Sequence, residues 1–174
     1  MLNSLLYVLI YCNYGNSIDS LKGFLLSSLL IVIAGIDLKT HYIYKSTTIF
    51  GIGAFIFIEI IDLLISWQIH WENLLAGALG VIVIGAIVFF TGGMGEGDIE
   101  IALIIGLFLG IKGLMLALFI AFILGGIIAS IFLILKFKER KAEIAFGPYL
   151  AMGAIISLLY STEIINWYIS LMKI

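Results

Sequence analysis

The sequence contains little of what soluble enzymes and secreted domains depend on. Its 174 residues include one cysteine, one proline and two histidines, and charged residues make up only 11% of the chain. A single cysteine, Cys12, provides neither a disulfide framework nor a multi-cysteine zinc site within this chain. The formal net charge is −2, and no basic stripe follows the spacing of a phosphate backbone. We therefore expect no nucleic-acid partner.

Apolar residues, by contrast, make up 63% of the sequence and give a mean hydropathy of +1.25. A bilayer core needs roughly 20 apolar residues per helix, and the apolar runs here are continuous rather than alternating. The sequence predicts an all-α, polytopic transmembrane bundle of six to eight helices, formed by one membrane-embedded domain over residues 1–174 and surrounded by a lipid bilayer. The N-terminal segment lacks a basic start and a small-residue cleavage site, so we expect it to remain as a first helix. The expected helices span residues 2–14, 20–36, 46–66, 73–91, 98–111, 112–135, 146–160 and 163–173.

Basic residues indicate how the helices cross the membrane. If the loop after Asp37 is cytoplasmic, alternate crossings place six basic residues inside and three outside, in agreement with the positive-inside rule. The inner set is Lys39, Lys45, Lys136, Lys138, Arg140 and Lys141, and the outer set is Lys22, Lys112 and Lys173. Residues 92–98 then lie on the same side as Asp37, at the cytoplasmic membrane face.

Most of the eleven acidic residues have an ordinary explanation at helix starts or in loops. Glu59 and Asp62 share one helical face near the outer end of their helix, where they would be interfacial or would make a polar contact inside the bundle. Asp37 lies at the membrane boundary and, taken alone, would pair with Lys39. Asp98 opens an apolar run and, taken alone, would be an N-cap.

Considered together, Asp37 and Asp98 favour acid-base chemistry. Two adjacent carboxylates do not readily ionise together, so one keeps a proton while the other can activate water. Such a pair could hydrolyse a peptide bond without a metal or another cofactor. Alternating glycines at 93, 95 and 97 would allow close approach of an extended substrate, or would simply form a flexible turn. The two histidines are expected on opposite sides, so they do not predict a shared metal site.

Three ordered segments resemble the type IV prepilin peptidases and the related archaeal preflagellin peptidases, which are intramembrane aspartyl proteases of the GxGD class. The segments are IAGIDLKTHYIYKSTTI at 33–49, GMGEGDIEIA at 93–102 and AFGPYLAMGA at 145–154. The resemblance implies that Asp37 and Asp98 are the catalytic pair and that Gly95 and Gly97 shape the active-site loop. It also implies a substrate, the basic leader of a type IV prepilin-like precursor, cleaved at the cytoplasmic membrane face.

The acids beside this loop have two interpretations. Glu96 and Glu100 could attract a basic leader electrostatically, or they could simply be solvated. Relatives often have a lysine at the position of Glu100, and an isoleucine-proline-asparagine turn where this chain has Ile43, Tyr44 and Lys45. Bifunctional relatives also carry a paired-cysteine region and an additional N-terminal helix, and the sequence shows neither. We therefore expect peptidase activity without N-methyltransferase activity.

Two other functions fit parts of the pattern. A proton- or ion-coupled transporter would use intramembrane acids along a pathway across the bilayer. A catalytically inactive relative would serve as an assembly subunit of a pilus or secretion machine. Both alternatives predict that precursor cleavage is absent.

Overall fold

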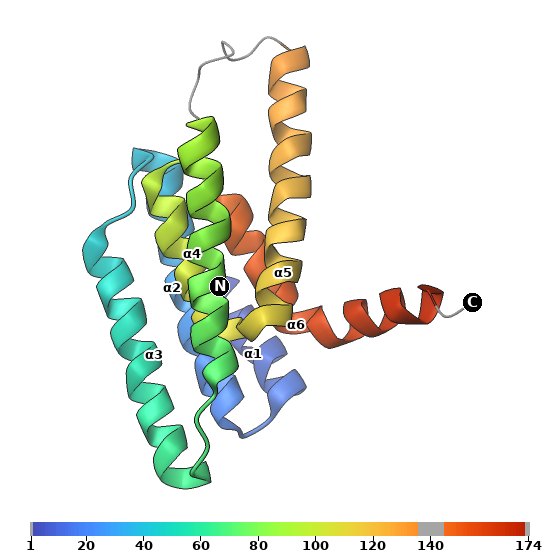
Figure 1. The fold of residues 1–174 in the computed structure, drawn as a ribbon. Helices are drawn as coiled ribbons and strands as arrows, with labels where there is room; N and C mark the ends of the chain where they lie inside the picture. The colour runs from blue at the N-terminus through green and yellow to red at the C-terminus, as the bar shows by residue number, and fades with distance from the viewer. Residues whose placement is uncertain (1, 136–144, 173–174) are drawn as a thin grey trace.

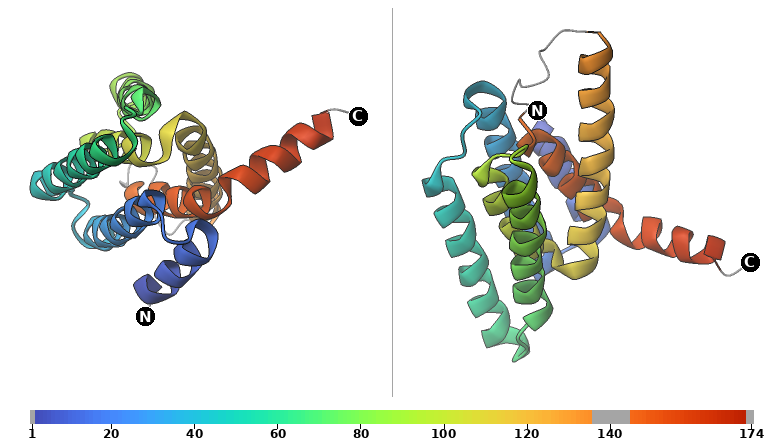
Figure 2. Two further views of the ribbon diagram at one scale, coloured as in Figure 1. Left: turned by 90° about the horizontal axis from the view of Figure 1, so that it is seen from below. Right: turned by 45° about the horizontal axis from the view of Figure 1, so that its top comes forward.

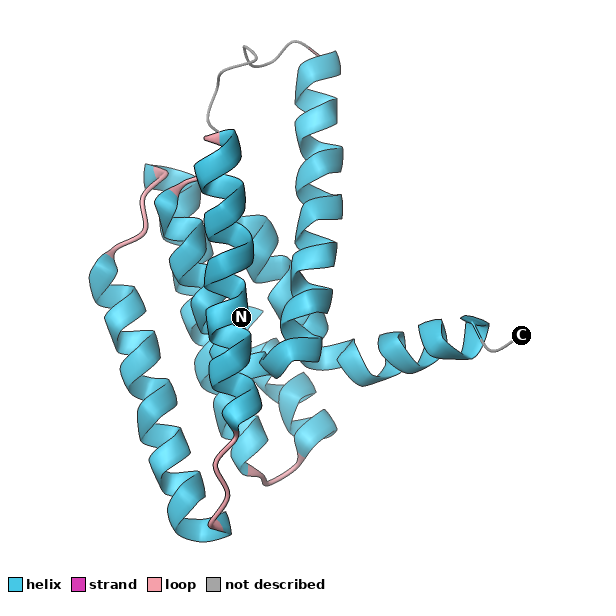
Figure 3. Cartoon of the chain, viewed as in Figure 1, coloured by secondary structure: helices cyan, strands magenta, loops and turns pink. Residues whose placement is uncertain are grey.

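The computed structural model describes residues 2–135 and 145–172. Within these ranges the secondary structure is helical and contains no strand, as Figure 3 shows. Lys136, Lys138, Arg140, Lys141 and Lys173, whose cytoplasmic or outer placement the charge pattern predicts, lie outside the described residues.

The chain forms a bundle of helices (Figure 1). Five of them are long and apolar enough to cross a membrane, which makes the chain a multi-pass membrane protein and confirms the expected all-α polytopic fold. The helices are α1 (Leu2–Tyr14), α2 (Ile18–Thr40), α3 (Lys45–Ser66), α4 (Trp71–Thr91), α5 (Glu96–Ile134) and α6 (Gly147–Met172).

Helix α5 reverses direction at Gly110, where φ is +68°. Glycine adopts this backbone conformation without the steric cost that a side chain would bring. The turn divides α5 into a first arm before Gly110 and a second arm after it, and Figure 1 shows the second arm rising beside the bundle. The break expected between residues 111 and 112 is therefore confirmed to within two residues.

Two expected boundaries are wrong. Helix α2 continues to Thr40 instead of stopping at residue 36, and His41 closes it in a left-handed conformation with its N–H bonded to the Asp37 carbonyl. Helix α6 runs unbroken to Met172, although two segments were expected. Figure 1 shows its C-terminal part projecting sideways from the bundle.

Close backbone packing joins α4 to the first arm of α5. A Cβ added at Gly80 would lie 2.5 Å from the Ala102 carbonyl oxygen, and one added at Gly106 would lie 2.4 Å from the Ala76 carbonyl oxygen. Small residues allow membrane helices to approach in this way. The first arm is thereby held rigidly against α4, with buried residues such as Ile101 and Ile105 in the core.

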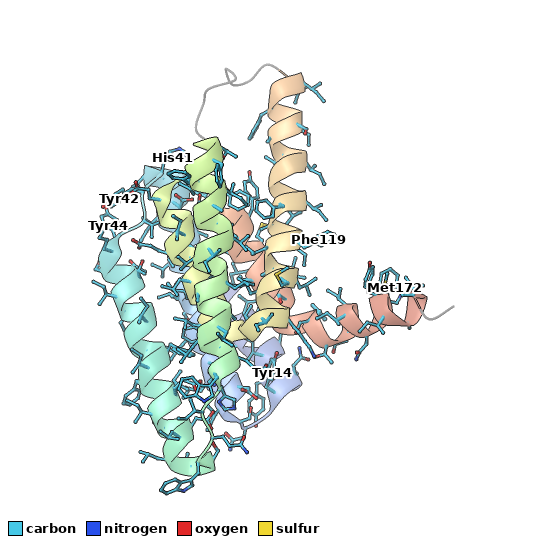
Figure 4. The ribbon with its side chains drawn as sticks, viewed as in Figure 1. Tyr14, His41, Tyr42, Tyr44, Phe119 and Met172 are labelled. Atoms are coloured by element: carbon cyan, nitrogen blue, oxygen red, sulfur yellow. The ribbon has the colours of Figure 1, made fainter. Side chains whose placement is uncertain are left out.

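Alternating chain directions gather different helix termini at the two ends of the bundle (Figures 1 and 2). One end, called here the cavity end, holds the last turn of α2 and the first turns of α3, α5 and α6, as well as the loop that follows α4. The opposite end, called the turn end, holds the start of α2, the α3–α4 connection and Gly110. Figure 4 shows His41, Tyr42 and Tyr44 together at the cavity end and Tyr14 at the other.

Candidate active site

A cavity of about 430 Å³ opens at the cavity end of the bundle. All six residues that the sequence singled out for the site border it, so the glycines and acids at residues 93–100 do meet the segment after α2. The lining residues are Asp37, His41, Tyr42, Ile43, Lys45, Gly92, Gly93, Met94, Gly95, Glu96, Gly97, Asp98, Glu100, Ala145 and Phe146.

Asp37 lies inside the last turn of α2 and is 5% exposed. Its Oδ2 accepts a hydrogen bond of 3.1 Å from the backbone N–H of Gly147, the first residue of α6. A Cβ at position 147 would lie 2.6 Å from the same oxygen, so only glycine allows this approach. The pairing with Lys39 that Asp37 alone would suggest is not among the ion pairs of the described residues.

Asp98 is also 5% exposed and lies in the first turn of α5. It is the third residue of the helix rather than its N-cap, and its Oδ2 accepts a 3.1 Å hydrogen bond from the Gly95 N–H. In return, the Asp98 N–H donates to the Gly95 carbonyl over 3.0 Å. The first of these bonds is the half of a capping box in which an acid at the third helical position reaches back to the N-cap N–H. The loop at residues 92–97, called here the glycine loop, is therefore ordered around the Asp98 side chain.

The Asp37 and Asp98 carboxylates lie close enough for their charges to interact. Each is held by a backbone N–H, and the parts of the chain that the structure describes contribute no ion pair to either. Two carboxyl groups whose charges interact do not readily ionise together, so one can act as a base while the other acts as an acid. The arrangement can therefore carry out proton transfer to and from a water molecule or a bound amide.

The two glutamates of this stretch differ in their surroundings. Glu96 is exposed at the start of α5. Glu100 is half-buried one turn further along, and the Thr48 hydroxyl of α3 donates a 2.5 Å hydrogen bond to its Oε2. Glu100 is therefore a positioned acid at the cavity wall, unlike the freely solvated side chain that was one of its two interpretations.

The turn between α2 and α3 closes without proline. Tyr44 caps α3 with φ −74°, close to the angle that a proline ring would impose. Ile43 is buried and packs against Gly97, where an added Cβ would lie 2.7 Å from its Cδ1. Gly97 thus provides room for the preceding turn to pack against the glycine loop.

Sequence reasoning missed the roles of Thr48, Ile43 and Gly147 in this arrangement. Gly147 belongs to a segment that the resemblance had singled out, which could have directed attention to its backbone. Thr48 is one of several small polar residues in the sequence KSTT, and nothing in the sequence distinguishes it from its neighbours.

Comparisons with known proteins agree with these observations. The model of the type IV leader peptidase family matches residues 24–130. A prepilin leader peptidase/N-methyltransferase of Bacillus subtilis is 30% identical over 91% of this chain and 63% of its own length. The protein of the same name from Xanthomonas campestris is 24% identical over 97% of this chain and 60% of its own length.

A third relative of that name, from Legionella pneumophila, is 40% identical over 44% of this chain and 26% of its own length. The chain thus spans less than two thirds of the length of these relatives. No solved structure matches the chain. The family model covers more than half of the residues, including Asp37, the glycine loop and Asp98. The chain therefore belongs to the type IV leader peptidase family.

Proposed function

We propose that the protein is an aspartic endopeptidase, formed by one membrane-embedded domain, that cleaves the basic leader of type IV prepilin-like precursors. One observation carries the proposal: two buried carboxylates, from α2 and α5, border a single cavity at one end of a membrane bundle. The family assignment supports the leader as substrate, because the relatives matched above are named prepilin leader peptidases.

In this proposal Asp37 and Asp98 are the catalytic residues. The ionised carboxylate accepts a proton from water as the water oxygen attacks the carbonyl carbon of the scissile amide. The protonated carboxyl donates its proton to the carbonyl oxygen, and a proton then passes to the leaving nitrogen as the C–N bond breaks. Water is consumed, and a new carboxyl group and a new amine are formed. No metal or other cofactor takes part.

The substrate-binding residues of the proposal are Gly95, Gly97, Glu96 and Glu100. The glycine loop leaves backbone groups accessible beside Asp98, so an extended peptide can approach closely. Glu96 on the rim and Glu100 on the wall provide negative charge for a basic leader. The Thr48 hydroxyl, which is hydrogen-bonded to Glu100, would keep one of these charges in place.

We further propose that the cavity faces the cytoplasm at the cell membrane. Cleavage there would meet a precursor at the point where its basic leader ends and its hydrophobic helix begins. Lys39 and Lys45 lie near the cavity end, while Lys22 and Lys112 lie near the turn end. The proposal covers cleavage of the leader and does not include N-methylation.

The test uses the full chain in nanodiscs with a prepilin-like precursor, and measures release of the leader by mass spectrometry. Asp37→Asn and Asp98→Asn should each abolish cleavage while the protein remains folded and inserted. Asp19→Asn, which makes the same change at an exposed position near the turn end, should cleave at the wild-type rate. Cleavage should also persist in a chelator.

Other outcomes would favour the competing functions. Full activity in both site variants would refute the aspartate mechanism. Precursor binding without cleavage by the wild type would favour an inactive assembly subunit. Proton or cation flux in liposomes without cleavage would favour a transporter.

A further inference from the structure

A second group of ionisable side chains lies at the turn end, remote from the cavity. Glu59 and Asp62 project from one face of α3, and His70 immediately precedes α4. Lys22 of α2 approaches both acids. Asp62 and Lys22 are 8% and 6% exposed, so this is a buried polar group at the end of an apolar bundle. Of the two interpretations that the sequence allowed for Glu59 and Asp62, the structure supports the polar contact inside the bundle.

Lys22 satisfies only part of this group. Its Nζ lies 2.6 Å from Oε1 of Glu59, whereas it is 3.7 Å from Oδ2 of Asp62, beyond hydrogen-bond distance. The second oxygen of Glu59, Oε2, faces His70 instead. Lys22 can therefore orient Glu59 through one oxygen while the other oxygen remains available to a different cation.

The Nδ1 atom of His70 is the unsatisfied atom in the group. It is buried and has no hydrogen-bond partner among the described residues, although it lies 3.5 Å from Oε2 of Glu59 and 3.4 Å from Oδ2 of Asp62. A buried polar atom without a partner is costly, and native structures rarely leave one in that state. Here, the orphan nitrogen faces two carboxylate oxygens.

These separations match the edges of a metal coordination polyhedron. Ligand atoms about 2.1 Å from a tetrahedral metal lie about 3.4 Å from one another. One ligand atom from each of Glu59, Asp62 and His70 can be chosen so that all three lie within 4.8 Å of one another. We propose that these three residues bind a divalent transition-metal cation such as Zn²⁺, with water as a further ligand.

The donor set and its surroundings fit this class of ion. One imidazole nitrogen and two carboxylate oxygens suit zinc and its neighbours better than they suit magnesium or calcium, which prefer oxygen alone. Lys22 would be the outer partner that fixes Glu59, as groups behind metal ligands commonly do. The His70 side chain is 41% exposed, which gives an ion a route from the surface.

The proposed metal would join the end of α3 to the start of α4. It lies at the opposite end of the bundle from Asp37 and Asp98, so it would brace the helices and take no part in proton transfer. The two histidines lie at opposite ends, as expected, and this site needs only one of them. The inference does not depend on the proposed peptidase activity.

The test measures zinc bound to the full chain, purified without a metal-binding tag, stripped with chelator and dialysed against Zn²⁺. Wild-type protein should retain one zinc per chain. His70→Gln and Glu59→Gln should each weaken binding at least tenfold. Glu72→Gln, which removes an exposed acid two residues beyond His70, is the matched control and should bind like the wild type.

Cobalt provides an independent measurement of the coordination. Co²⁺ in the wild-type site should give the visible absorption bands of a tetrahedral nitrogen and oxygen environment, and His70→Gln should lose them. Failure of the wild type to retain zinc would overturn the proposal, as would equal zinc binding by the wild type and both ligand variants. Because His70 is partly exposed, His70→Gln should remain folded even if Glu59→Gln does not fold.

Discussion

The two ends of the bundle each hold a pair of buried or half-buried acids, but they hold them differently. At the cavity end, Asp37 and Asp98 each accept a backbone N–H and border open space. At the turn end, Glu59 and Asp62 stand against the Lys22 ammonium. An acid beside a fixed cation is held in an ionic contact within the protein, whereas acids held only by backbone amides and bordering a cavity are open to a visiting molecule. The same side-chain chemistry therefore suits catalysis at one end and structure at the other.

The test with the largest expected effect compares two single variants, each with an aspartate changed to asparagine at one end of the bundle. Asp98→Asn should lower the rate of leader cleavage by on the order of 10⁴-fold, because it removes a proposed proton-transferring group. Asp62→Asn should leave the rate per folded molecule within a few fold of wild type. Single-turnover cleavage, normalised to the folded fraction, measures both. Equal losses in the two variants would show that the ends do not differ in function.

Removing the Lys22 ammonium at the turn end should affect the stability of the fold instead of leader cleavage. Lys22→Met leaves two acids without their charge partner and should cost about 3 kcal/mol of unfolding free energy, since breaking a buried ion pair is strongly unfavourable. Thermal unfolding of metal-free protein in detergent measures the change. Lys39→Met, at an exposed position of the same helix, should unfold like the wild type. If Lys22→Met unfolds like the wild type, the lysine contributes little to the free energy of unfolding.

Gly147→Ala should disturb the cavity end without changing any charge. The added methyl group would collide with Oδ2 of Asp37 and displace the carboxylate, lowering cleavage by roughly 10²-fold. Gly126→Ala is the control, because no atom of residues 2–135 or 145–172 lies within 4 Å of a Cβ added there. Cleavage rates for the two variants at matched folded fraction provide the comparison. Wild-type activity in Gly147→Ala would argue against the Gly147 contact as a positioning device.

The smallest expected effect concerns Glu100. Thr48→Val keeps the shape of the side chain but removes the hydrogen bond to Glu100, a loss of about 1 kcal/mol. We expect KM for a basic leader to rise several fold while kcat changes little, because the acid is mispositioned and the aspartates are untouched. With a leader whose lysines are replaced by glutamine, the difference in KM between Thr48→Val and the wild type should be smaller. A change confined to kcat would instead assign Thr48 to the chemical step.

Much of the fold could be predicted because it depends on local patterns. Long apolar runs determined most of the helices, and the break beside Gly110 was visible in the sequence IGLFLGIKG. The limits of α2 and α6 were less visible, since residues such as Lys39 and Glu163 can lie within a helix as readily as beyond it. Terminal turns are decided by capping contacts that apolar periodicity does not encode.

The acids that border the cavity were predictable from the sequence, but their hydrogen-bond partners were not. Asp37 and Asp98 stood out because carboxylates are expensive near apolar runs. The Gly147–Asp37 hydrogen bond joins residues 110 positions apart in the sequence, and the Thr48–Glu100 hydrogen bond joins residues 52 positions apart. No local sequence pattern indicates such contacts. Lys22 was placed at the same end as Glu59 and Asp62, yet its contact with them depends on how α2 packs against α3.

The reversal at Gly110 decides at which end of the bundle α6 begins. An unbroken α5 of 39 residues would extend about 58 Å, nearly twice the thickness of the hydrocarbon core. By folding α5 back on itself, the turn brings the start of α6 to the end of the bundle where the first arm began. Gly147 can reach Asp37 only in that arrangement. The positive φ of one residue at the turn end thus decides at which end of the bundle the last part of the cavity wall is built.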